Sequence, residues 1–192
     1  MSLGFIRIRG FLNPADCLAI REAMDVGAVE DAEVLGHGIP RQSHVRNAAL
    51  VEPPVRLIEA IEVRLDSCRH HVAEALGLGV EEREGAGFIR YPEGGFFRAH
   101  RDRGDAPQWA DASRRAIALV LFLNSSRDAS PDGDFEGGVL RLLGPDDAID
   151  VVPEAGTLVA FPADVLHEVT EVRGGTRDTV VDWFYDVNLP DS

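Results

Sequence analysis

Residues 86–102, AGFIRYPEGGFFRAHRD, contain two short runs of aromatic and β-branched residues separated by a proline and two glycines. Such runs, bounded by turn-forming residues, are typical of β-strands. Similar runs recur to the end of the chain, and no helical period separates them. Because parallel strands need crossover helices, we expect antiparallel strands that close as a double-sheet jelly roll. The expected strands are Ala86–Tyr91, Phe96–Asp102, Arg115–Leu123, Val139–Leu143, Ala148–Val152, Thr157–Phe161, Leu166–Val172 and Asp178–Val187.

Two helical stretches precede these strands. The first is expected from Asn13, a capping residue followed by a proline at the first helical position, to about Asp25. The second begins at Pro53-Pro54, carries apolar residues at steps of three and four, and ends at Gly77. The pattern therefore predicts a mainly β protein with flanking helices, of the α+β class.

The chain length suits a single domain. We expect residues 1–192 to form one unit, with a helical N-terminal part over about 1–80 and a jelly-roll core over about 84–188.

The two cysteines are too few for a disulfide framework and are expected to be buried, reduced thiols, which suits a cytoplasmic protein. The longest apolar run, Ala116–Leu123, is shorter than a membrane span requires, and we expect no export or membrane insertion.

The net charge limits the classes of partner. It is −14 at pH 7, with a sequence isoelectric point near 4.7. A surface this acidic repels phosphate backbones and anionic lipid head groups, so we expect neither nucleic acid nor a membrane as a partner.

The histidines are the main candidates for chemistry, since the sequence lacks a phosphate-binding glycine loop and a nucleophile elbow. His100 and Asp102 stand two residues apart in an expected strand, so their side chains should project from one face. His167 lies in a later strand-like segment. Two imidazoles and one carboxylate form the facial triad of non-haem Fe(II) oxygenases, which leaves coordination positions open. A chance His-x-Asp match and a core His167 bonded to the main chain are the alternatives.

A candidate anion-binding residue follows the triad. Arg177 stands ten residues beyond His167, after a turn at Gly174-Gly175. A guanidinium inside a barrel is costly unless a carboxylate meets it, and its planar fork suits bidentate capture of one. The alternative is a surface salt bridge with Asp178 or Asp182.

At this point the chain resembles a known family. Residues 91–102, YPEGGFFRAHRD, resemble the Tyr-x-x-Gly-x-x-Tyr-x-x-His-x-Asp strand of the Fe(II)/2-oxoglutarate-dependent dioxygenases, in their prolyl 4-hydroxylase-like branch. His167 and Arg177 resemble that family's distal histidine and the basic residue about ten positions later. Further similarity covers most of the chain, in Phe11–Cys17, Leu121–Asn124, Phe135–Gly138 and Gly156–Pro162.

The resemblance implies a double-stranded β-helix (cupin-like) fold and a metal site. By it, His100, Asp102 and His167 are the catalytic residues that bind Fe(II), with 2-oxoglutarate as cosubstrate, O2 as the oxidant and ascorbate as an accessory reductant. Decarboxylation of 2-oxoglutarate to succinate would be coupled to hydroxylation of a C–H bond. Asp102 favours hydroxylation because halogenating relatives carry a small residue at its position; desaturation and cyclisation remain open.

The resemblance also implies how the cosubstrate is bound. Arg177 would pair with the distal carboxylate of 2-oxoglutarate, and Tyr91 would donate a hydrogen bond to it. Thr170 and Trp183 would line that pocket. The chain departs from many relatives at Phe97, where they carry a tyrosine.

The substrate is less well defined. Arg98 is expected to share the strand parity of His100 and could meet a carboxylate or phosphate on the substrate; a pair with Asp105 or Glu136 is the alternative. Trp109 could form a lid or simply pack. Small molecules, free amino acids and peptidyl residues, prolyl among them, remain candidate substrates. A non-catalytic jelly-roll module that binds a metal or a carboxylate is the alternative to an enzyme.

Overall fold

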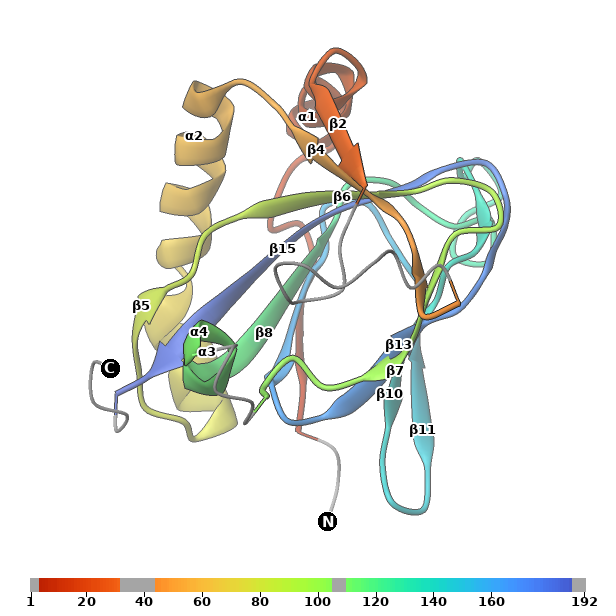
Figure 1. Ribbon diagram of the computed structural model, residues 1–192. Helices are drawn as coiled ribbons and strands as arrows, with labels where there is room; N and C mark the ends of the chain where they lie inside the picture. The colour runs from red at the N-terminus through yellow and green to blue at the C-terminus, as the bar shows by residue number, and fades with distance from the viewer. Residues whose placement is uncertain (1–3, 32–43, 105–109, 188–192) are drawn as a thin grey trace.

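A computed structural model describes residues 4–31, 44–104 and 110–187, which form two facing sheets with helices on the outer side of the larger one (Figure 1). All pairings between the named strands are antiparallel. The larger sheet has the order β1 (Ile6–Ile8), β12 (Leu158–Pro162), β8 (Arg115–Phe122), β15 (Arg177–Asp186), β6 (Gly87–Tyr91), β4 (Ala49–Glu52) and β2 (Ala28–Asp31), with β5 (Val80–Arg83) also paired to β15. The smaller sheet has the order β11 (Ala148–Val151), β10 (Leu140–Leu143), β13 (Leu166–Val169), β7 (Phe96–His100) and β3 (Arg46–Asn47). A separate pair joins β14 (Val172–Gly174) to β9 (Glu136–Gly137).

Strand β8 shows how the layers pack, because all eight of its residues are buried. Leu119 and Leu121 join the apolar cluster under the helices, whereas Val120 and Phe122 join the cluster between the two sheets. A strand covered on both faces has a continuous apolar sequence in place of an alternating one. The expected antiparallel jelly-roll core, a double-stranded β-helix, is confirmed.

The first helix has the predicted limits. Helix α1 spans Pro14–Asp25, and the Asn13 side chain accepts a hydrogen bond of 2.8 Å from the Asp16 N–H. That bond satisfies one of the N–H groups that a helix start leaves unpaired.

The second predicted helix is two helices, so the expectation of one continuous helix was wrong. Helix α2 (Val55–Asp66) and helix α3 (Arg69–Leu76) are separated at Ser67 and Cys68. The Ser67 hydroxyl donates to the Arg64 carbonyl, and the Cys68 thiol donates to the Leu65 carbonyl. Side chains that bond nearby main-chain carbonyls compete with the helical pattern, which explains the break. The end at Gly77, in the left-handed conformation at φ 67°, is as predicted.

The N-terminal part is less helical than expected. It contributes β1 to β5, and four of these strands pair with strands of the core: β1 with β12, β3 with β7, β4 with β6 and β5 with β15. Each has two to four residues, too few to show an alternating pattern in the sequence. The boundary expected near residue 80 therefore does not separate a helical layer from a β core, because strands from the N-terminal part belong to the sheets of the core.

Several predicted limits in the core also differ from the structure. The segment expected over Leu166–Val172 divides into β13 and β14, and the strand expected over Phe96–Asp102 ends at His100. Between the strands expected over Phe96–Asp102 and Arg115–Leu123, the structure has helix α4 (Ala110–Arg114), which the sequence pattern did not predict.

The cysteines are as predicted: Cys17 and Cys68 are free and buried, and burial raises the pKa of the Cys68 thiol to about 11. In the described part of the chain, no helix is long and apolar enough to cross a membrane.

Candidate active site

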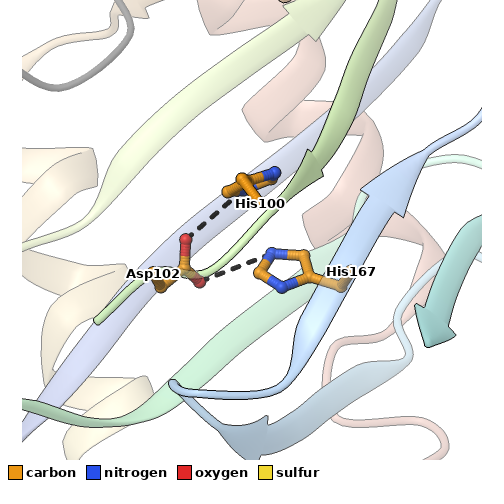
Figure 2. Close-up of side chains that lie close together, drawn as sticks. All are labelled: His100, Asp102 and His167. Atoms are coloured by element: carbon orange, nitrogen blue, oxygen red, sulfur yellow. Dashed lines mark ion pairs between the residues drawn. The ribbon is translucent and has the colours of Figure 1, made fainter. Parts of the chain in front are cut away.

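Two neighbouring strands of the smaller sheet bring the predicted metal ligands together. His167 on β13 is in register with His100 on β7, and Asp102 lies just beyond the end of β7. Figure 2 shows the Asp102 carboxylate between the two imidazoles, with Oδ1 3.5 Å from His100 Nε2 and Oδ2 3.6 Å from His167 Nε2. One ligand atom from each residue lies within 4.8 Å of the others.

The main chain orients both imidazoles. His100 Nδ1 lies 2.8 Å from the Arg98 carbonyl oxygen, and His167 Nδ1 lies 2.9 Å from the Val165 carbonyl oxygen. Each Nδ1 must carry a proton to donate to a carbonyl, so each Nε2 keeps its lone pair and faces Asp102. Burial also lowers the pKa of His167, which favours the neutral ring.

The donor set fits a metal ion. Adjacent ligands bonded at about 2.1 Å to one octahedral ion lie about 3 Å apart, close to the separations between Asp102 and the two imidazoles. The N···O distances of 3.5 and 3.6 Å exceed those of ordinary hydrogen bonds. Burial alone would raise the pKa of the Asp102 carboxyl, but positive charge on the neighbouring His167 and His100 rings, when these are protonated, and the Trp183 indole hold this pKa well below its usual range. A bound cation would take the place of the ring protons and would keep the carboxylate ionised beside two neutral rings. A buried carboxylate with two imidazole nitrogens suits a divalent cation of Fe(II) type.

A β-bulge decides which side chains share the face of the triad. His167 and Val169 pair with His100 and Phe97, so two residues of β7 stand opposite one of β13. Phe97 consequently lies on the same face as His100, and the two rings stack with centroids 3.5 Å apart.

The parity expected for Arg98 was wrong for the same reason. The bulge removes Arg98 from the face of His100. Its side chain is exposed and its guanidinium carbon lies 4.3 Å from the centroid of the Phe96 ring. Of its two expected alternative partners, Glu136 pairs with Arg127, and Asp105 lies outside the described residues, as does Trp109.

Arg177 is a buried cation. It is 1% exposed, at the start of β15, and it forms no ion pair with a carboxylate in the described ranges. Its Nε has no hydrogen-bond partner there. The surface salt bridge considered as an alternative is absent, since Asp178 pairs with Arg21 and Arg90. Asp182, the other candidate partner, pairs with Arg83.

Aromatic rings surround the Arg177 guanidinium. Its central carbon lies 4.9 Å from the centroid of the Tyr91 ring and 5.5 Å from that of Phe122. Tyr91, 3% exposed on β6, is in register with Arg177. Burial lowers the pKa of Arg177 to about 10, and the neighbouring Tyr91 and Asp178 only partly oppose this effect. The residues therefore offer an incoming carboxylate a cation with unused donor capacity.

The site of Arg177 is in the same interior as the triad. Phe122, which contacts Arg177, belongs to the apolar cluster between the sheets, and so does Phe161. The edge of Phe161 meets His167, with ring centroids 4.8 Å apart. Both candidate binding groups thus border one apolar region between the two sheets.

Gly138 provides the space that Arg177 occupies. A Cβ atom at Gly138 would lie 2.8 Å from Arg177 Cδ, and the residue has a φ of +59°. In Gly138→Ala, we expect a loss of about 1–2 kcal/mol from the left-handed backbone, a further loss from crowding of Phe135 and Val172, and displacement of the Arg177 guanidinium. We expect its KM for 2-oxoglutarate to rise severalfold in a succinate assay.

Gly10→Ala is the matched control, because Gly10 has a φ of +65° and open space where its Cβ would stand. It should lose only the backbone contribution in thermal unfolding and keep the wild-type KM. An equal rise in KM for both variants would show that backbone strain, and not crowding of Arg177, is responsible.

The other two residues predicted to line the cosubstrate pocket, Thr170 and Trp183, have different neighbours in the structure. The Thr170 hydroxyl accepts a hydrogen bond of 2.9 Å from the Val139 N–H, which ties the β13–β14 connection to the start of β10. Its contact with 2-oxoglutarate stays a prediction. Trp183 lies near Asp102, and its indole Nε1 is buried without a hydrogen bond of ordinary geometry in the described part of the chain.

Two arginines near the triad have contacts that sequence reasoning missed. Arg46 on β3 places its guanidinium carbon 4.5 Å from the centroid of the Phe97 ring. Arg115 at the start of β8 is 2% exposed and contacts Asp102, Glu84 and Trp183. Its position directly before the longest apolar run was the available signal.

Comparisons with known proteins agree with this geometry. Residues 86–185 match the model of the 2OG-Fe(II) oxygenase superfamily. A PKHD-type hydroxylase of Acidovorax ebreus is 29% identical over 184 residues, covering 93% of this chain and 76% of the relative. A Pseudomonas putida prolyl-4-hydroxylase has a TM-score of 0.72 at 27% identity, covering 96% of this chain and 94% of that one.

A more distant structure shares the fold. A prolyl hydroxylase from Trichoplax adhaerens, in complex with a hypoxia inducible factor peptide fragment, has a TM-score of 0.74 at 18% identity, covering 96% of this chain and 84% of that one. The family model spans more than half of the chain and includes the triad and Arg177. The resemblance seen in the sequence is confirmed, and the chain belongs to the 2OG-Fe(II) oxygenase superfamily.

Proposed function

We propose that this chain is an Fe(II)- and 2-oxoglutarate-dependent hydroxylase in which His100, Asp102 and His167 hold the iron and Arg177 and Tyr91 hold the cosubstrate. One observation carries the proposal: three metal donors converge within 4.8 Å beside an apolar interior that also contains a guanidinium without a carboxylate partner among the described residues. A module that only binds a metal has no need of the second feature.

The triad determines the charge at the metal. Bound Fe(II), together with 2-oxoglutarate and O2, supplies the oxidising chemistry that couples formation of succinate and CO2 to hydroxylation of a C–H bond. His100 and His167 contribute neutral Nε2 atoms, because each Nδ1 donates to a carbonyl. Asp102 contributes one negative charge, so one positive charge of the ion stays uncompensated. This charge favours an anionic cosubstrate next to the metal.

Arg177 and Tyr91 orient that cosubstrate. The guanidinium of Arg177 is held among aromatic rings and can meet a carboxylate through two N–H groups. The Tyr91 hydroxyl can donate to the same carboxylate, because the Tyr91 ring lies directly beside the guanidinium. Burial removes water from the guanidinium and the carboxylate and so strengthens the attraction between them. A dicarboxylic keto acid would therefore be held at both ends, one end beside the metal that His100, Asp102 and His167 would hold and the other by Arg177.

The test measures succinate formed from 2-oxoglutarate by protein supplied with Fe(II) anaerobically and then exposed to O2. Ascorbate is included because the resemblance predicts it as an accessory reductant. We expect turnover that depends on Fe(II) and 2-oxoglutarate and increases with a substrate. A protein that binds both, yet forms no succinate with or without any member of a substrate panel, would instead be a non-catalytic module.

The substrate panel begins with proline derivatives. A structural neighbour at 27% identity over nearly the full length of both chains is a prolyl-4-hydroxylase, so free proline and proline-containing peptides come first. Other amino acids and small molecules follow. Mass spectrometry of the product separates a gain of one oxygen atom from the loss of two hydrogens that desaturation or cyclisation gives.

The proposal extends to the chain's organisation and location. We propose a single domain, since the N-terminal strands complete both sheets of the core. We also propose a cytoplasmic protein, which the two free buried cysteines support.

A further inference from the structure

We propose that Arg115 is a positioning residue for the metal ligand Asp102, acting through the Asp102 main chain and the Trp183 indole. The inference rests on the proposed role of the triad as the iron site. It concerns how the chain holds the one ligand that no strand pairing holds, since Asp102 follows the last residue of β7.

The contacts of Arg115 are built into the interior. Its side chain is 2% exposed, and its Nε and Nη2 donate to both carboxylate oxygens of Glu84. This two-point contact fixes the plane of the guanidinium. The remaining nitrogen, Nη1, donates to the Asp102 carbonyl oxygen at 3.3 Å. The Glu84 carboxylate therefore aims Arg115 at the main chain of Asp102.

A second connection ties Asp102 to the same strand. The Asp102 N–H donates to the Ala163 carbonyl at 3.0 Å, and the Ala163 N–H donates to the Ala116 carbonyl at 2.8 Å. The Asp102 N–H is thus connected through Ala163 to Ala116, and the Asp102 carbonyl is connected directly to Arg115. Consecutive residues of β8 hold both polar groups of the Asp102 main chain, and β8 is buried along its whole length.

Arg115 also positions the indole beside the carboxylate. Its guanidinium carbon lies 3.7 Å from the centroid of the Trp183 ring, a close stacked contact. The Trp183 Nε1–H lies near the Asp102 side chain and has no other hydrogen-bond partner in the described ranges. Stacking on Arg115 fixes the plane of the indole ring. The same guanidinium therefore restrains Asp102 twice, directly at its main-chain carbonyl and through Trp183 at its side chain.

Arg83 provides a matched comparison. Like Arg115, it forms ion pairs away from open solvent, but it is only partly buried and pairs with two carboxylates, Glu62 at 2.6 Å and Asp182 at 2.9 Å. Among the described residues, its ion-pair partners do not include Asp102 or either histidine. A loss of general stability should therefore follow from either substitution, whereas a change at the metal should follow only from loss of Arg115.

The experiment measures Co(II) binding to the purified apoprotein by anaerobic calorimetry and by the visible absorption of the bound ion, with thermal unfolding of each apoprotein in parallel. Arg115→Met is expected to weaken Co(II) binding about 10- to 100-fold, the usual effect of losing a group that orients a ligand, and to change the Co(II) spectrum. Arg83→Met should lower Tm and keep the wild-type Co(II) affinity and spectrum.

Glu84→Gln is the second variant, in case Arg115→Met does not fold. Its side chain is partly exposed, and the change leaves Arg115 in place but removes the charge that aims it. We expect a severalfold loss of Co(II) affinity in the same direction. Wild-type Co(II) affinity and spectrum in Glu84→Gln would overturn the proposal, as would equal weakening by Arg83→Met.

The outcomes separate this proposal from the proposed function. If wild-type protein and His100→Ala bind Co(II) equally, the triad is not the metal site and both proposals are wrong. If wild-type binding depends on His100 and Arg115→Met retains it in full, only the positioning role is wrong.

Discussion

Replacement of His100 by alanine is expected to reduce succinate formation from 2-oxoglutarate at least about 100-fold, because loss of an outer group that merely orients a ligand already costs 10- to 100-fold. The change removes one of three protein donors and also the ring that stacks on Phe97. Metal binding and turnover should fall together. Succinate release, measured with Fe(II) added anaerobically, and Co(II) affinity give the two readings.

His71→Ala is the control for this prediction. His71 is exposed on helix α3, and its loss removes an imidazole without changing the triad. It should keep wild-type activity and metal affinity. Full activity in His100→Ala would show that the triad assignment is wrong.

Replacement of Arg177 by methionine is expected to change cosubstrate affinity and stability in opposite directions. The variant loses the charged donor for the distal carboxylate, and KM for 2-oxoglutarate should rise roughly 10- to 100-fold, as expected for loss of strong charge-assisted hydrogen bonds. The apoprotein loses a buried cation that no carboxylate among the described residues pairs with, so its Tm should not fall, and we expect a small rise. Succinate kinetics and thermal unfolding measure the two effects.

Arg90→Met gives the contrast. Arg90 pairs with the buried Asp178 through two hydrogen bonds, at 2.7 and 3.1 Å, and its removal leaves that carboxylate with one fewer partner. This variant should lose Tm and keep the wild-type KM for 2-oxoglutarate. A large fall in the Tm of Arg177→Met would show that Arg177 stabilises the folded chain and is not held ready for a ligand.

The sequence predicted the elements whose signals are local. Helix α1 begins after a capping asparagine and a proline, and β8 is a run of eight residues too apolar for a surface strand. These signals depend only on neighbours in the chain. The triad and Arg177 were found in a different way, from the order and spacing of a family motif, and they stand in the region that the family model matches.

The sequence missed what depends on distant partners. The bulge in β7 exists only relative to β13, so an alternating pattern placed Arg98 on the face of His100 when Phe97 lies there. The short strands β1 and β3 exist only because β12 and β7 offer them partners. For Arg115, the chain separates the residue from Glu84 by 31 positions, and no local pattern connects the two.

Both histidines of the proposed iron site, His100 and His167, obtain their orientation from main-chain carbonyl groups two residues earlier in the chain. The partner of His100 is a strand residue, Arg98 on β7, and the partner of His167 is Val165, in the turn just before β13; both partners are main-chain carbonyls and not acidic side chains. The tautomer of each ring therefore depends on a carbonyl only two residues away in the chain. Loops that leave these two segments unchanged can be exchanged or shortened, in evolution or in the laboratory, to admit different substrates while the same two rings continue to present Nε2 to the ion.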